Sequence, residues 1–530
     1  MKRIKTAPRG PGAHSAIAAA IWAVASGLAQ AQPVQWDGSN YAVGNGAGQN
    51  VSTQWNLAVG EAAGSNVSGG NANQAIGFNA GQDVQGGWNQ SIGRSAGQDV
   101  TGDYNNAVGF WAGTGVTGSQ NTAIGSNAGR NVAGSNNQAL GNGAGQNVGT
   151  NWNVAIGEGA GSNVGGKNAN QAIGYYAGTN VQGGWNQSIG RSAGQNVSGD
   201  YNNGVGFWAG TDTRGNHNTA LGSNAGRNVT GDANQAMGQD AGRDVVGNNN
   251  QSAGQNAGQQ VRGSGNQASG MNSGQAVTGD NNLATGPYAG SEVTGSNNQA
   301  SGLGAGRGVQ GSNNVAQGTG AGLGVQGNDN VSIGSGAGRG ITADRAVSIG
   351  SAAVASASDS VAIGAGAQAS AANSVALGTG SQAVRGAQPE YQAYGMAGPQ
   401  SSTGELNVGG RQITGVAAGS ADTDAANVGQ LRAVTQTTER GLSSLRSQVH
   451  SMDRELRAGV AAAMATAGLP QAYLPGRNMV SLAGGTWNGE SGYALGLSRV
   501  SASGSWVVNA AANGSSRGDM GGAVGVGYQW

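Results

Sequence analysis

The sequence predicts three consecutive parts: a head built as a parallel β-solenoid, a short α-helical coiled-coil stalk, and a C-terminal set of four long β-strands. Three observations support this fold class. A 16-residue repeat fills positions 41–346, a heptad pattern of apolar residues begins at Val428, and four strand-like segments end the chain. Each pattern has its own period, and the spacing of apolar residues is the main signal of secondary structure in a sequence.

The composition argues against an ordinary globular enzyme. Of 530 residues, 105 are Gly, three are Phe, and only 9% are charged, whereas a large closely packed interior needs many bulky side chains. The 25 basic and 25 acidic side chains balance, so no basic stripe is expected and nucleic acid is excluded as a partner. The absence of cysteine excludes disulfides, thiolate metal sites and cysteine nucleophiles. We expect no cofactor and no metal.

The N-terminus has the pattern of a secretory signal peptide. Four basic residues between positions 2 and 9 precede the apolar run 15–29, and Ala29 and Ala31 form a small-x-small cleavage site. A transmembrane anchor is the alternative, but this run is too short to span a bilayer comfortably. We predict a signal peptide over 1–31 and a mature chain that begins at Gln32.

The head is predicted over 32–388. Units such as QAIGFNAGQDVQGGWN, 16 residues long and twice 17, occur nineteen times from Tyr41 to Ala346, and three 14-residue units fill 347–388. All 22 units have Gly at their fourth position, and the longer ones have Val at the eleventh, except for Thr213 and Ile341. Gly supplies corners with positive φ, and Asn in the last turn tolerates left-handed geometry. Stacked coils of this kind build a core only together, and 22 of them would extend roughly 100 Å.

Two further features of the array bear on its packing and its origin. Residues 41–137 recur as 138–234, which lengthens the array without a new fold. The third position of the unit is apolar in the early coils and then becomes polar or small, at Ala253, Ser269, Thr285, Ser301 and Gln317. If the third position faces the core, the segment 253–317 is expected to be weakly packed.

After a neck or connector over 389–427, the stalk is predicted over 428–469. Heptad positions a and d carry an apolar seam over four to five heptads, the minimum for a coiled coil. A single amphipathic helix on a globular core is the alternative, but no such core is near. The predicted core residues of a trimeric coiled coil are Val428, Leu431, Leu442, Leu445, Val449, Met452 and Leu456. Alanines over 461–465 then reduce the diameter of the helix, as expected for a helix that passes through a confined space.

The last part, 470–530, contains strand-like segments at 478–487, 490–500, 505–512 and 519–530. Each has the length of a tilted strand that spans a bilayer, and aromatic residues lie where a membrane girdle is expected. Four strands cannot close a barrel, whereas three chains with four strands each give twelve, which can. The predicted girdle and assembly signal are Trp487, Tyr493, Trp506, Tyr528 and Trp530.

The chain resembles the trimeric autotransporter adhesins of the YadA-like family. The units VSIGSAAVASASDS, VAIGAGAQASAANS and VALGTGSQA resemble the head repeats, RQITGVAAGSADTDAANVGQL resembles the neck, and 470–530, ending in Trp530, resembles the membrane anchor. The resemblance implies a left-handed trimeric β-roll head and a twelve-stranded outer-membrane barrel. It also implies delivery to the periplasm of a Gram-negative cell, insertion by the outer-membrane β-barrel assembly machinery, and surface display. The 16-residue unit and the short stalk depart from the family pattern.

Aromatic side chains fall on variable positions of the repeat, and no Trp occurs between Trp208 and Trp487. They therefore lie at the end of the head that is far from the anchor, where a ligand is met first. Exposed aromatic patches often mark interaction surfaces. The alternative is that they pack between coils or along trimer seams. The candidate adhesive surface comprises Trp55, Trp88, Tyr104, Trp111, Trp152, Trp185, Tyr201 and Trp208.

The predicted function is adhesion to host matrix, cell surfaces or other surfaces, together with autoaggregation. The alternative is a self-associating biofilm fibre or a complement-evasion fibre without a dedicated host receptor, because a fold does not fix its ligand. Catalysis is not expected, since His14, His217 and His450 have no carboxylate or nucleophile arrangement around them in the sequence. The receptor class, whether matrix protein, mucin, glycan or abiotic surface, is left open.

Overall fold

The computed structural model describes residues 34–36 and 39–530. It divides into two compact units, one ending at Gly410 and one spanning Arg411–Trp530. The first is a β-solenoid, and the second contains one long helix and four antiparallel strands. The predicted cleavage site at Ala29, Ala31 and Gln32 lies outside the described residues.

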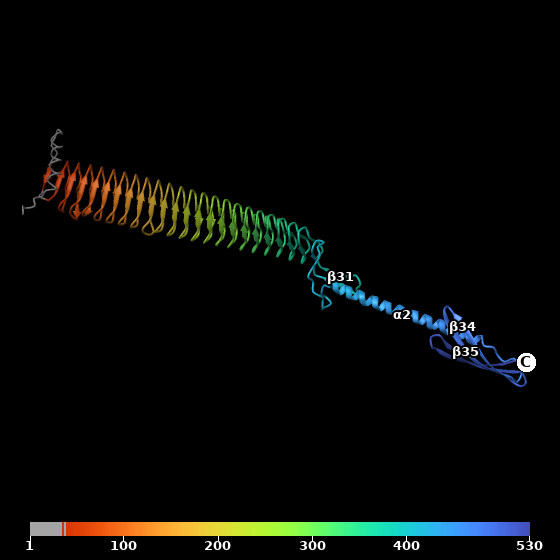
Figure 1. Cartoon of the computed structure of the whole chain (residues 1–530). Helices are drawn as coiled ribbons and strands as arrows, with labels where there is room; N and C mark the ends of the chain where they lie inside the picture. The colour runs from red at the N-terminus through yellow and green to blue at the C-terminus, as the bar shows by residue number, and fades with distance from the viewer. Residues whose placement is uncertain (1–33, 37–38) are drawn as a thin grey trace, which may run out of the picture. The chain divides into compact units, whose positions relative to one another are not determined.

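One face of the solenoid is a long parallel sheet to which each repeat contributes one short strand (Figure 1). Neighbouring strands pair in register, so that Tyr41 lies opposite Leu57 and Ala42 opposite Ala58. β1 (Val34–Trp36) covers the first strand by antiparallel pairing with β2. The parallel strands are β2 (Tyr41–Val43), β3 (Leu57–Val59), β5 (Gln74–Ile76), β7 (Gln90–Ile92), β8 (Asn106–Val108), β9 (Thr122–Ile124), β10 (Gln138–Leu140), β11 (Val154–Ile156), β12 (Gln171–Ile173), β13 (Gln187–Ile189), β14 (Asn203–Val205), β15 (Thr219–Leu221), β17 (Gln235–Met237), β19 (Gln251–Ala253), β20 (Gln267–Ser269), β21 (Leu283–Thr285), β22 (Gln299–Ser301), β23 (Val315–Gln317), β24 (Val331–Ile333), β25 (Val347–Ile349), β27 (Val361–Ile363), β29 (Val375–Leu377) and β33 (Leu406–Asn407).

A second line of pairing runs through the twelfth position of the longer units and through the eighth and ninth positions of the 14-residue units. It consists of isolated bridges, such as Thr101 with Thr117, and of two-residue strands. Beyond the last coil, an antiparallel hairpin leaves the solenoid before β33 returns to pair with β29. These strands are β4 (Ser68–Gly69), β6 (Gln85–Gly86), β16 (Val229–Thr230), β18 (Val245–Val246), β26 (Val354–Ala355), β28 (Gln368–Ala369), β30 (Gln382–Ala383), β31 (Gln388–Gln392) and β32 (Pro399–Ser402).

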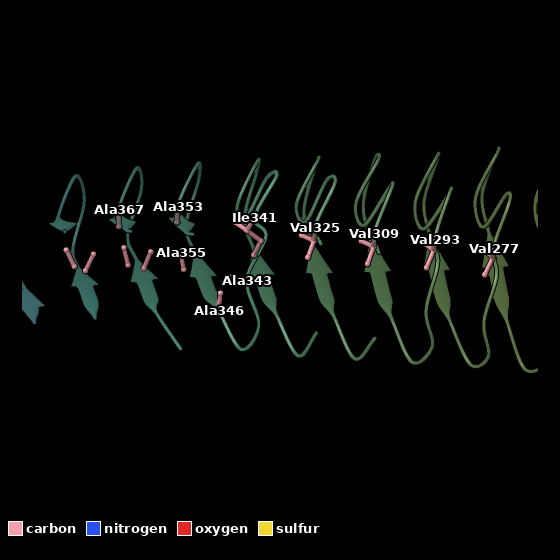
Figure 2. Packing of buried hydrophobic residues seen from close by; sticks show 14 of the residues in the cluster. Val277, Val293, Val309, Val325, Ile341, Ala343, Ala346, Ala353, Ala355 and Ala367 are labelled. Atoms are coloured by element: carbon pink, nitrogen blue, oxygen red, sulfur yellow. The ribbon is translucent and has the colours of Figure 1, made fainter. Parts of the chain in front are cut away.

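The core of the solenoid is made of small side chains in columns. Ala or Ser at the second position, Ala at the seventh and Val at the eleventh are buried in successive coils, as the aligned valines Val277 and Val293 show (Figure 2). The third position points outward, because alternate residues of a strand face opposite sides. Ser269 is exposed while its neighbour Ala268 is buried. The expectation of a weak core over 253–317 is therefore wrong: those polar residues lie on the outer surface.

Asparagine at the last position of every 16- or 17-residue coil except the final one, which ends in Ala346, forms a buried ladder. Asn266 is typical: its Oδ1 accepts the backbone N–H of Asn282 at 3.0 Å, and its Nδ2 donates to the carbonyl of Gly279 at 2.9 Å. This Asn was predicted to lie in a turn, but the left-handed turn residue is the preceding one, such as Asn281 with φ 57°. The ladder therefore satisfies backbone groups inside the core, where an unpaired group is costly.

Two glycine positions are required by close approach of the backbone. At the fourth position, φ lies between 106° and 137° in all 22 coils, and a Cβ on Gly93 would lie 2.6 Å from the carbonyl oxygen of Gly109. At the eighth position, a Cβ on Gly290 would lie 2.7 Å from the Cβ of Ala284. Neither site can accept a side chain without displacing the neighbouring coil or the core.

The end of the solenoid is tied to β33 by one carboxylate. Glu405 accepts hydrogen bonds from the backbone N–H groups of Val384 and Arg385 and pairs with the Arg385 guanidinium at 2.8 Å. The hydrogen bonds from the Arg385 backbone and side chain lower the pKa of Glu405. The carboxylate therefore holds the segment after the hairpin against the last coil most strongly in its ionised form.

The second unit begins its helix with a complete capping box. The helix is α2 (Val428–Ala467), and Asn427 is its N-cap. The side chain of Asn427 accepts a hydrogen bond from the backbone N–H of Gln430, and the side chain of Gln430 accepts one from the backbone N–H of Asn427. The strands β34 (Asn478–Trp487), β35 (Glu490–Val500), β36 (Trp506–Ser515) and β37 (Met520–Tyr528) pair in sequence order as an antiparallel sheet. In the described part of the chain, no helix combines the length and the apolar character needed to cross a membrane.

Candidate adhesive surface and membrane anchor

The eight aromatic residues of the predicted adhesive surface are all exposed on the single chain, from 65% for Trp55 to 37% for Trp208. Four of those at the fifteenth position stack in pairs on rings of adjacent coils. Trp88 lies 6.1 Å from Tyr104, with ring planes inclined by 11°, and Trp185 lies 5.2 Å from Tyr201. The rings contact one another between coils, as the alternative interpretation expected, yet their outer parts stay accessible to a ligand.

A second aromatic line occupies the corner formed by the fifth, sixth and ninth positions. The guanidinium of Arg94 lies 5.6 Å from the ring centres of both Phe78 and Phe110, and that of Arg130 lies 4.8 Å from the ring centre of Trp111. We call these five residues the proximal corner patch, since they are the nearer of two such patches to the N-terminus. Such distances are typical of cation–π contacts.

The same arrangement recurs 97 residues later, as the duplication requires. Arg191 lies 5.6 Å from the rings of Tyr175 and Phe207, and Arg227 lies 4.8 Å from Trp208. These five residues form the distal corner patch. The tryptophans of both patches were predicted from the sequence and the arginines were not, although each arginine stands at a fixed repeat position near aromatic residues.

The backbone under many of these rings is left-handed. Trp88, Trp111 and Tyr201 have φ of 61°, 55° and 58°, a region that costs a non-glycine residue about 1–2 kcal/mol. At these fifteenth and sixth positions, later coils have the tolerant residue Asn, as at Asn297 and Asn272. The fold of the single chain gives no burial in return for this strain, so the aromatic residues are better explained by a role at the surface.

One ion pair lies beside the fifteenth-position rings. Lys167 pairs with Asp200, the residue before Tyr201. The hydrogen bond from Lys167, followed by that from the backbone of Gly184, lowers the pKa of Asp200. The carboxylate is therefore ionised and neutralised at neutral pH, and it adds little net charge to the surface around Tyr201.

The predicted coiled-coil residues of α2 lie together on the helix and are exposed on the single chain. The exposed fraction ranges from 54% for Leu442 to 68% for Leu456. The helix changes character near its end, where Ala458, Ala461 and Ala465 are buried. A seam of large apolar residues that the chain itself does not cover is typical of a helix that packs against other helices.

The alanine segment of α2 lies directly on the glycine residues of the sheet. A Cβ on Gly492 would lie 2.2 Å from the backbone nitrogen of Ala462, and a Cβ on Gly485 would lie 2.6 Å from the carbonyl of Ala461. Asn513 also donates to the Thr466 hydroxyl at 2.7 Å. The slimmed helix anticipated from the sequence is thus matched by glycine on the strands that it touches.

The opposite face of the sheet is apolar and exposed, as Leu482, Leu495 and Val526 show. The predicted girdle residues Trp487, Tyr493, Trp506, Tyr528 and Trp530 are exposed as well. Trp506 and Tyr528 lie on neighbouring strands with ring centres 4.9 Å apart. Along β35, buried and exposed residues alternate strictly, as expected for a strand with a helix on one side and lipid on the other.

Comparison with known proteins accounts for the three parts. The YadA head domain repeat matches 342–367 and 355–381, the coiled stalk of trimeric autotransporter adhesins matches 412–454, and the YadA-like membrane anchor domain matches 470–530. A segment of 131 residues, 24% of the chain, is 45% identical to the autotransporter adhesin NhhA of Neisseria meningitidis. A segment of 128 residues, 23% of the chain, is 41% identical to the autotransporter adhesin EhaG of Escherichia coli O157:H7.

The matched segments cover 21% and 8% of those two relatives. The head-repeat, stalk and anchor models match in that order along the chain, and the structure has a β-solenoid, a helix and four long strands at the corresponding places. The chain therefore contains, in order, the head-repeat, stalk and membrane-anchor domains of the YadA-like family of trimeric autotransporter adhesins, and these matches support an outer-membrane anchor with an exposed head.

Proposed function

We propose that the chain forms a homotrimer whose three C-terminal sheets close one twelve-stranded barrel and whose heads adhere to a surface outside the cell. The observation that carries this proposal is the set of surfaces that the single chain leaves uncovered: the apolar seam of α2, the outer apolar face of the sheet, and the edges of β34 and β37. All three are covered at once when three chains associate and the sheet enters a membrane.

The stalk supports the trimer through its heptad seam. Leu442, Leu445 and Val449 are each more than half exposed on the single chain. Burying such side chains stabilises a structure by about 1.5–3 kcal/mol each. Three parallel helices that share this seam would bury all seven predicted core residues.

The anchor supports the same stoichiometry. β34 and β37 each pair on one side only, and open strand edges are not tolerated in lipid. Pairing of β37 of one chain with β34 of the next, repeated three times, leaves no edge. We assign insertion to the outer-membrane β-barrel assembly machinery, with the terminal Trp530 as part of the assembly signal.

The head offers a third surface for trimer contact. Outward-facing third-position residues form an apolar column in the early coils, with Ile124, Leu140 and Ile156 each about two-fifths exposed. Residues that point out of the main sheet can pack against the same sheet of another chain. The polar third positions over 253–317 then belong to this outer seam.

Adhesion is assigned to the aromatic surface of the first eleven coils, including Trp55 and Trp152, because exposed aromatic residues dominate many binding interfaces. The ligand is a host matrix or cell-surface component, another surface, or a second cell that displays the same chain. The second candidate function is a self-associating or complement-evading fibre without a dedicated host receptor. No catalytic role is proposed, since the family is one of adhesins.

The first test compares cells that express the full chain with cells that express it without 470–530. A heat-resistant band near three times the monomer mass in outer membranes, lost on deletion, supports the anchored trimer. Adherence to matrix-coated and bare surfaces, and settling of cell suspensions, then separate ligand binding from self-association. A monomer-sized band in the soluble fraction would refute anchor, stoichiometry and display together.

A further inference from the structure

The two corner patches are equivalent sites on one chain. Corresponding residues differ by 97 positions, which is six coils, and the same cation–π distances of 5.6 and 4.8 Å occur in both. At roughly 4.8 Å per coil, their centres lie about 29 Å apart along the solenoid. The head therefore presents the same chemistry twice, in one line and in one orientation.

Each patch has two arginines that form no ion pair with a carboxylate of the described chain. Within the described residues, no carboxylate lies within ion-pair distance of Arg94, Arg191 or the two ninth-position arginines of the patches. By contrast, Arg307, which also stands at a ninth position, pairs with Glu292 at 2.9 Å. Arg307 is neutralised within the fold, whereas Arg94 and Arg191 are exposed and available to a ligand.

The rings fix these arginines in a form suited to anions. A guanidinium that lies over a ring keeps its N–H groups free, because they lie in its own plane and form a fork that matches a carboxylate. Arg94 and Arg191 are exposed between two rings, and the edges of aromatic rings carry partial positive charge. Each patch therefore favours a carboxylate held at the corner of the coil.

We propose that the two corner patches bind a polysaccharide with a carboxylate in each repeating unit, one stretch of the same chain at each patch. This inference rests on the proposed adhesive function and names its ligand class. Two equivalent sites in line favour a ligand that itself repeats, as a polymer of acidic sugars does, and the unpaired arginines favour a ligand that carries carboxylates. Binding at two linked sites multiplies affinity through effective concentration.

The probe is fluorescent hyaluronan, applied to cells that display the full chain, with neutral dextran of equal length and double-stranded DNA as comparison polymers. We expect hyaluronan to bind, dextran and DNA not to bind, and added salt to weaken binding. Arg94→Gln or Arg191→Gln alone should lower the apparent affinity by about a hundredfold, since one of two linked sites is lost. The double variant should lose binding, and Arg307→Gln should leave it unchanged.

The inference would be overturned by hyaluronan binding of the double variant equal to that of the original chain, by a preference for DNA over hyaluronan, or by loss of the heat-resistant trimer in the double variant. The last would place these arginines in the trimer seam. If cells adhere to other surfaces but ignore hyaluronan, the ligand class is wrong and the adhesin proposal stands. If they neither adhere nor aggregate, the adhesin proposal itself fails.

Discussion

Replacing one asparagine of the buried ladder tests how the head is held together. Asn266→Ala removes the acceptor for the backbone N–H of Asn282 and the donor to the carbonyl of Gly279. Both groups are left inside the solenoid, and each unsatisfied buried group costs about 1–3 kcal/mol. The expected loss of local stability is therefore about 2–6 kcal/mol. The matched control is Gln267→Ala, because Gln267 directly follows Asn266 and its side chain is exposed on the outer side of β20.

The assay is amide hydrogen exchange of the full chain purified in detergent. A solenoid is stabilised between nearest neighbours, so the coils that contain Asn250, Asn266 and Asn282 should exchange faster, while coils near Asn105 should not change. A loss of 2 kcal/mol corresponds to about a thirtyfold increase in the opening equilibrium. Equal exchange in Asn266→Ala and Gln267→Ala would refute the reasoning, since it would mean that the freed groups find partners without cost.

Three further outcomes follow from contacts at other places in the chain. Glu405 has a lowered pKa because of hydrogen bonds from the neighbouring arginine, so its tether should be intact above the ordinary pKa of 4.5 and lost as the pH falls through the lowered value. Proteolysis of the segment 386–410 should accelerate in acid, and Glu405→Gln should remove that pH dependence. Gly290→Ala should lower the melting temperature more than Gly304→Ala, because both have positive φ but only the first would place a Cβ against another atom within 4 Å; equal melting temperatures would contradict this. Gly492→Ala should abolish surface display, measured by antibody labelling of intact cells, because its Cβ would meet the helix backbone, whereas Gly527→Ala has open space around it and should be displayed normally.

Much of this architecture follows from the sequence because each part has a distinct period. The fixed Gly and Val of the repeat predict the coils, the heptads predict α2, and the segments at 478–487 and 490–500 coincide with β34 and β35. The side of the strand that faces inward could not be read from polarity alone. The inward-facing second residue of the strand is only Ala, as at Ala284, whereas the larger apolar residues of the third position lie on the outside. This is the reverse of the usual pattern, in which the larger apolar side chains are buried.

The ladder was missed for a related physical reason. Asn is a turn residue by propensity, and two consecutive asparagines, such as Asn297 and Asn298, differ in role although they are chemically identical. Asn297 is exposed with φ of 61°, while Asn298 is buried and donates to Gly311 at 2.9 Å. Only the constancy of the sixteenth position, beside the variation of the fifteenth, signals that the second asparagine is the structural one.

The outward orientation of the third position gives the polar segment 253–317 a physical meaning. Because the core under Ser269, Thr285 and Ser301 keeps its buried Ala and Val columns, the coils themselves lose nothing there. What changes is the surface that three heads would share: apolar near Ile156, small or polar at the third positions from Ala253 to Gln317, and apolar again at Ile333 and Ile349. A trimer seam of this composition would be joined by apolar contacts on either side of 253–317 and hydrated within that segment. Heads separated by denaturant should therefore part first over 253–317 while each solenoid stays folded.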